Sequence, residues 1–115
     1  MHDYDKPIDY HNTVELRSLL DKYNVVVDKL NEKIGSLNKI EREIRINLAK
    51  HDSKLKDTLS YQQKMIKLIS IDPTNESIVN LYHDISTEIK VLTHQKSLIE
   101  EQIKCEKKIF DSTPK

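Results

Sequence analysis

Apolar residues recur along this chain in alternating steps of four and three positions. The first series, Leu16, Leu20, Tyr23, Val27, Leu30, Ile34 and Leu37, follows this spacing without interruption. The same phase continues, less regularly, through Glu41, Ile44, Leu48, His51, Leu55, Thr58, Gln62, Met65 and Ile69. Such spacing is typical of helices in coiled coils. Asn12, with Glu15 three residues later, forms an N-cap pattern. The pattern predicts one long helix over residues 13–71.

A short turn signal separates this helix from a second one. Asp72 can cap a new helix with Pro73 at its first position, where the missing N–H costs no hydrogen bond. Thr74 or Asn75 is an alternative cap. The four–three spacing then resumes in the series Ile78, Tyr82, Ile85, Ile89, Leu92, Lys96, Ile99, Ile103, Glu106 and Phe110. We therefore predict a turn at 72–75 and a second helix over 76–110, antiparallel to the first because the connection is short.

The two series can be paired by assuming that the chain reverses at Pro73. Facing positions then lie equally far from the turn, as in the layers Ile69–Ile78, Leu55–Leu92, Leu48–Ile99 and Ile44–Ile103. Nearly every layer is apolar on at least one side. The register therefore supports an all-α fold built as a long antiparallel coiled-coil hairpin.

Two layers of this register are polar. His51 would face Lys96, and Glu41 would face Glu106. A polar layer fixes register at a cost in stability. At Glu41, the neighbouring Ile40 and Ile109 are able to rotate inward instead. We expect either a locally loosened coil at these layers, or a hinge or a point where another subunit's side chains enter.

The second helix is too short to cover residues 13–36, which hold the richest apolar stretch. Leu19 and Val26 lie beside the main series and widen the apolar stripe, which suits packing against more than one helix. We expect residues 13–36 to overhang the hairpin half at 37–71 and to oligomerise. The predicted partner interface is Val14, Leu16, Leu19, Leu20, Tyr23, Val26, Val27, Leu30 and Ile34. The alternative is a three-helix bundle, in which Gly35-Ser36 breaks the helix and residues 13–34 fold back.

The two ends of the chain lack this periodicity. Residues 1–12 are predicted to form an extended or disordered arm, and residues 111–115 a flexible tail. Thr113, followed by Pro114, fits a proline-directed phosphorylation site.

Composition supports a helical protein and argues against several partners. Of 115 residues, 33% are charged and only 5% aromatic, a profile typical of coiled coils. The 19 basic and 19 acidic residues balance, whereas nucleic-acid binders usually carry a basic excess. Cys105 is the single cysteine and no long apolar run is present. We therefore expect no nucleic-acid partner, no membrane span, and a soluble intracellular protein of the cytoplasm or nucleus.

Residues for catalysis or ligand binding do not form any recognisable motif. The five histidines, His2, His11, His51, His83 and His94, include no pair spaced four apart as on a zinc-binding helix. Gly35 is the only glycine, so no phosphate-binding glycine loop exists. We predict no metal, no cofactor and no enzymatic activity.

These observations favour a structural or adaptor subunit that assembles through coiled-coil packing, either as a homodimer or as a hetero-oligomer in a larger intracellular complex. Two alternatives are a chaperone-like clamp built from helical hairpins and a nucleic-acid-binding hairpin arm.

Overall fold

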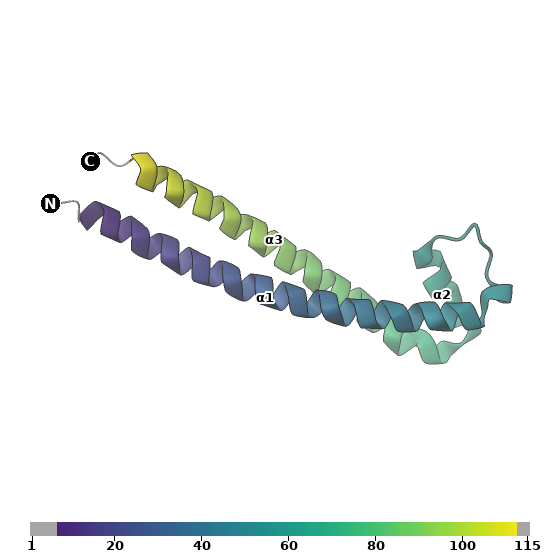
Figure 1. Cartoon of the computed structure of the whole chain (residues 1–115). Coiled ribbons are helices and arrows are strands. Elements are labelled where there is room, and N and C mark those ends of the chain that lie inside the picture. Colours follow the sequence, from purple (N-terminus) through teal and green to yellow (C-terminus); the bar gives the residue numbers. More distant parts are fainter. Residues whose placement is uncertain (1–6, 113–115) are drawn as a thin grey trace. The chain divides into compact units, whose positions relative to one another are not determined.

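The structure is all helical, as the spacing of apolar residues predicts. The computed structural model describes residues 7–112, and the side chains of residues 14–109 among them. The elements are α1 (Pro7–Lys50), the 3-10 turn η1 (Asp52–Lys54), α2 (Tyr61–Ile71), the 3-10 turn η2 (Pro73–Asn75) and α3 (Glu76–Ser112) (Figure 1). No strand occurs within this range. Antiparallel packing of α1 against α3 confirms the hairpin.

The chain divides into two compact units, each described by itself below. The terminal unit comprises residues 1–31 and 90–115, and joins the first part of α1 to the last part of α3. The turn unit comprises Glu32–Ile89, and joins the end of α1 to α2 and the beginning of α3.

Helix α1 begins earlier than the sequence suggests. Pro7 is its first residue, a position where a fixed φ and a missing N–H are both tolerated. Residues 7–12 of the predicted arm are therefore helical, while residues 1–6 lie outside the described part. At the other end, α3 continues to Ser112, and the predicted tail from 113, with Thr113, also lies outside it.

Gly35 lies within α1, which continues through it to Lys50. A Cβ placed on Gly35 would meet no atom within 4 Å, so neither a turn nor a close approach requires glycine there. The alternative fold, a three-helix bundle with a break at Gly35-Ser36, is therefore wrong. Helical hydrogen bonds on both sides of a single glycine outweigh its cost of about 1 kcal/mol.

The prediction of one continuous helix from 13 to 71 is also wrong, because the chain leaves helical geometry between His51 and Ser60. Asp52 and Ser53, weak helix formers, enter η1 directly after α1 ends. Ser60 then starts α2 with a capping box: its Oγ accepts from the Gln63 N–H at 3.2 Å, and Gln63 Oε1 accepts from the Ser60 N–H at 2.8 Å. This reciprocal cap gives the new helix a defined beginning.

The break allows α2 to pack beside α1 and α3 and to form the core of the turn unit. The buried apolar side chains come from all three helices and the connecting segment: Ile40, Ile44, Leu48, Leu55, Met65, Leu68, Val79 and Ile85. Ile44, Met65 and Leu68 are fully inaccessible to solvent. Leu55 anchors the non-helical segment to this core. The predicted turn at 72–75 is confirmed, with Asp72 as the cap and Pro73 at the first position.

The pairing of α1 with α3 differs from the predicted register. Within the turn unit, Lys33 Nζ lies 3.1 Å from Glu88 Oε2. Within the terminal unit, Tyr23 contacts Glu100. Folding back of α2 takes up chain that a single hairpin would have used, so α3 pairs with a more N-terminal stretch of α1. Residues 14–31 are not an overhang, because they share a unit with the last part of α3.

Candidate interaction surface

In the terminal unit, one column of α1 residues forms the face that α3 covers. Leu16, Leu19, Tyr23 and Val26 are half-buried, and Leu30 is buried. On α3 the corresponding column is Leu92, Lys96, Ile99, Ile103 and Glu106, all half-buried or buried. Leu30 and Ile103, each 9% exposed, are the most deeply buried apolar residues of the described part of this unit. The two helices therefore bury a narrow stripe and leave much apolar surface in solvent.

A polar contact accompanies this stripe. The Tyr23 hydroxyl donates to Glu100 Oε2 at 3.3 Å. Lys96 Nζ lies 3.8 Å from the same oxygen, one helical turn earlier on α3. Glu100 therefore holds a tyrosine of α1 and a lysine of α3 together. Lys96, predicted to lie in a polar layer opposite His51, instead has Glu100 as its ion-pair partner.

An open apolar groove runs along one side of the terminal unit. Its walls are Asp21, Lys22, Val25 and Val26 from α1 and Gln95, Leu98, Ile99 and Gln102 from α3. Val25 and Leu98 are 53% and 52% exposed, so about half of each aliphatic side chain meets solvent in the groove. Val91 and Ile109, each 52% exposed, lie about two helical turns before and about three turns after Leu98 on α3. Apolar side chains therefore gather on this side of both helices.

The predicted partner interface is divided by the structure into two sets. Leu16, Leu19, Tyr23, Val26 and Leu30 are half-buried or buried on the face that α3 covers, so most of their surface is already used within the chain, although Val26 also lines the groove. Val14 and Leu20 remain 45% and 41% exposed, Ile34 in the turn unit is 40% exposed, and Val27 is half-buried. Sequence reasoning missed Val25 and Leu98, because neither lies in the four–three series. The sequence feature that could have identified them is a large apolar residue, on each helix, at a position outside the four–three series.

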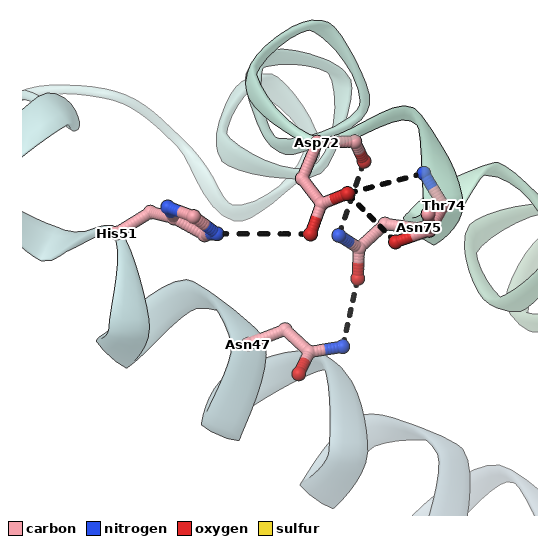
Figure 2. A network of polar contacts seen from close by, with 5 residues as sticks. All are labelled: Asn47, His51, Asp72, Thr74 and Asn75. Carbon is pink, nitrogen blue, oxygen red and sulfur yellow. Dashed lines mark hydrogen bonds and ion pairs between the residues drawn. The ribbon is translucent and has the colours of Figure 1, made fainter.

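A network of polar groups lies in the turn unit, between the end of α1 and the turn at η2 (Figure 2). Asp72 Oδ1 accepts from the Thr74 hydroxyl at 2.7 Å and from the Thr74 N–H at 3.2 Å. The Asn75 amide donates to the Asp72 carbonyl oxygen at 3.1 Å, and Asn47 donates to Asn75 Oδ1 at 2.7 Å. Asn75 is only 3% exposed, so these bonds satisfy a buried polar side chain.

The same network explains the surroundings of Asp72 and His51. The side-chain and backbone hydrogen bonds from Thr74 lower the pKa of Asp72, and the nearby His51 acts in the same direction. His51 Nε2 lies 3.9 Å from Asp72 Oδ2. The residue predicted to form a polar layer or hinge therefore directly follows the last residue of α1 and contacts the turn cap.

Glu41 and Glu106, predicted to face each other, belong to different units. Within the turn unit, Ile40 is buried, and Glu41 lies beside Arg45 with Oε2 3.7 Å from Nη2. The predicted inward position of Ile40 is confirmed. Ile109 is instead 52% exposed. Glu106 is half-buried on α3 in the terminal unit.

One buried hydroxyl in the turn unit lacks a hydrogen bond. Among the described residues, Tyr61 Oη is inaccessible to solvent and has no partner. Its ring packs edge-on to Tyr82, with centroids 5.9 Å apart, and Arg45 lies 4.9 Å from its centroid. Burial raises the pKa of Tyr61, and the Arg45 guanidinium partly offsets this. The aromatic pair fills the core beside α2 at the cost of one unsatisfied polar atom.

The described residues contain no group of three or more His, Cys, Asp and Glu side chains placed to hold a metal ion. None of the helices, as far as they are described, combines the length and apolarity needed to cross a bilayer. No family model, curated protein or solved structure matches the chain significantly. The candidate site therefore rests on the apolar groove of the terminal unit.

Proposed function

We propose that this chain is a non-enzymatic coiled-coil subunit, structural or adaptor in role, which assembles with itself or with other helical subunits through the terminal unit. The groove around Val25 and Leu98 carries the proposal. Two aliphatic side chains, each about half exposed, line one groove between two helices. Because each side chain is already about half-covered, its full burial against a partner is worth roughly 1 kcal/mol, about half the value for a fully exposed aliphatic residue.

The narrow interface within the terminal unit gives a second reason. Two helices that bury so few side chains have little hydrophobic free energy to set against the entropy of ordering the chain. A further helix laid on the groove would convert the pair into a three- or four-helix bundle, in which wide apolar stripes are the rule. Assembly would thus stabilise the same segment that it uses.

Substitution in the groove tests the proposal. Val25→Asp together with Leu98→Asp would place two charges in the contact with a partner helix, while both positions are exposed enough to leave the fold intact. Ile66→Asp is the matched control, because Ile66 is 67% exposed on α2 in the turn unit. Sedimentation equilibrium would measure self-association, and crosslinking in an extract of the source cell would capture helical partners.

We expect the groove variant to lose its partner, whether a second copy or another subunit, and the Ile66→Asp control to retain it. Far-ultraviolet circular dichroism would verify that each variant remains helical. A chain that neither self-associates nor loses a captured helical partner on groove substitution would contradict the proposal.

A further inference from the structure

Two acidic and two basic residues surround Val25 in a fixed order along α1. Asp21 and Lys22 lie four and three residues before Val25, and Asp28 and Lys29 lie three and four residues after it. On an α-helix these four are the nearest surface neighbours of Val25. All four are exposed. Among the described side chains none of them forms an ion pair, although Asp21 and Lys22 line the groove itself.

This order is self-complementary in one orientation. If α1 of a second copy lies antiparallel across the first with the two Val25 side chains in contact, Asp21 faces Lys29 of the second copy. Lys22 then faces Asp28 of the second copy, and the two-fold axis repeats both pairs. In a parallel arrangement with the same central contact, each of these residues would face its own kind. Charges beside an apolar contact select orientation and register in this way.

We propose that the occupant of the groove is a second copy of this chain, docked antiparallel about a two-fold axis at Val25 to form a four-helix bundle from two terminal units. The inference rests on the proposed assembly function and specifies its partner. It does not require any additional ligand, because the same surface supplies both sides of an isologous contact.

Helix α3 fits the same axis. Leu98 lines the same groove as Val25, so the axis brings Leu98 near Leu98 of the second copy. Val91 and Cys105 lie seven residues before and after Leu98 and are both exposed. They would face each other across the axis as an apolar side chain and a small thiol. Gln95 would face Glu101 of the second copy, a pairing of an amide with a carboxylate. This α3 pairing places apolar residues together and sets no like charges opposite each other.

The available area is sufficient for a dimer of modest affinity. Residues 14–31 span roughly 27 Å of helix, and two adjacent helices present a face roughly 20 Å wide. Two such faces would bury about 1,000 Å² in total, near the lower limit for a specific interface. We therefore expect a dissociation constant on the order of micromolar.

Charge exchange provides the decisive experiment, because it leaves Val25 and Leu98 unchanged. Asp21→Lys with Asp28→Lys makes the four neighbours of Val25 all basic, and Lys22→Asp with Lys29→Asp makes them all acidic. Each double variant alone should dimerise about tenfold to a hundredfold more weakly than the unmutated chain, and the loss should shrink in high salt. Mixed in equal amounts, the basic and acidic variants should form a heterodimer. In the quadruple variant all four charges are reversed, so each antiparallel contact again joins an acidic residue to a basic one. This variant should homodimerise like the unmutated chain.

A disulfide tests the axis directly. In a Cys105→Ser background, Val25→Cys should form an interchain disulfide on mild oxidation, because the axis brings the two positions together. Asn24→Cys in the same background is the matched control and should form no interchain disulfide, although it should still dimerise without a covalent bond, since Asn24 points to another side of the helix. Sedimentation and non-reducing electrophoresis give the two readouts.

The outcomes separate this inference from the proposed function. A dimer that is unaffected by the charge exchanges, or an unmutated chain that is monomeric at about 1 mM, overturns the two-fold dimer. If the groove substitution Val25→Asp with Leu98→Asp still abolishes binding of another helical subunit in those cases, the proposed assembly function stands. If neither the charge exchanges nor the groove substitution weakens any association, the two-fold dimer and the assembly function are both overturned.

Discussion

Leu68 provides the sharpest test of the turn unit, because two interpretations of α2 assign it opposite roles. The strict four–three phase places Ile69 in the seam and Leu68 beside it. In the structure Leu68 is 0% exposed, whereas Ile69 is half-buried at the edge of the core. Removing the Leu68 side chain beyond Cβ from such a site costs about 3 kcal/mol, through lost transfer energy and the cavity left behind.

This loss is large for a unit of this size. A segment such as Glu32–Ile89 has roughly 3–9 kcal/mol of stability in total. With a urea dependence of about 1–3 kcal/mol per molar, Leu68→Ala should lower the unfolding midpoint by roughly 1–3 M. Urea titration followed by far-ultraviolet circular dichroism would measure the shift.

Two matched variants complete the experiment, since each removes the same number of carbon atoms from α2. Ile69→Ala should cost less than Leu68→Ala, and Ile66→Ala, at a position 67% exposed, should change stability by about 0.5 kcal/mol or less. A larger loss for Ile69→Ala than for Leu68→Ala would refute the packing of α2 and restore the seam predicted by the phase alone.

Three further predictions use the same titration. Gly35→Ala should stabilise the chain by about 0.5–1 kcal/mol, because Gly35 is helical and a Cβ there meets no neighbour; destabilisation would mean that α1 is not regular at this point. Tyr61→Phe should leave stability unchanged or raise it by up to about 1 kcal/mol, because it removes a buried hydroxyl without a partner. Since the pKa of Tyr61 is raised above 10.0, the parent should also lose stability as pH rises through the raised value, and the Phe variant should lose less. The pKa of Asp72 is lowered from 3.8, so its contribution to the free energy of unfolding is present above that value and is lost as pH falls through the lower folded value. In Asp72→Asn the free energy of unfolding should therefore fall less steeply between about pH 5 and pH 2. An unchanged dependence on pH would contradict the role of the Thr74 hydrogen bonds.

The sequence predicts α3 and the turn well, because each depends on local rules. Every position of the second apolar series from Ile78 to Glu106 is half-buried or buried. Asp72 caps η2 with Pro73 at the first position, as the residue types require. Both features follow from side chains within a few positions of one another, without knowledge of what packs against them.

The break in α1 escaped prediction for an identifiable reason. Between His51 and Met65 the phase continues mainly through polar residues such as Thr58 and Gln62, which add no burial. Ser60 and Gln63 have the spacing of a capping box, and the structure forms that box. A cap has a physical mechanism that a phase carried by polar residues lacks, so the Ser60–Gln63 spacing marks the beginning of α2.

The register of α1 could not be decided locally. Leu19 and Leu20 are adjacent candidates for the same layer, as are Val26 and Val27, and both choices preserve the four–three spacing. In the structure Leu19 is half-buried and Leu20 is 41% exposed. The choice depends on where α3 reaches α1, which in turn depends on the break before α2. The local pattern therefore does not determine which of two adjacent residues faces α3, because that depends on the tertiary fold.

Residues 14–31 pair with α3 and still expose apolar surface that a partner would cover. Residues 14–31 are covered by α3 along one column, yet Val14, Leu20 and Val25 remain exposed on other sides of the same helix. A helix with apolar residues on several sides is typical of a bundle interior, whereas the terminal unit provides one neighbour. Because a partner that binds only the folded helices stabilises them by mass action, assembly and folding of this unit should be linked. Amide hydrogen exchange in residues 14–31 should therefore slow as protein concentration rises, while exchange around Ile44 in the core of the turn unit should not depend on concentration.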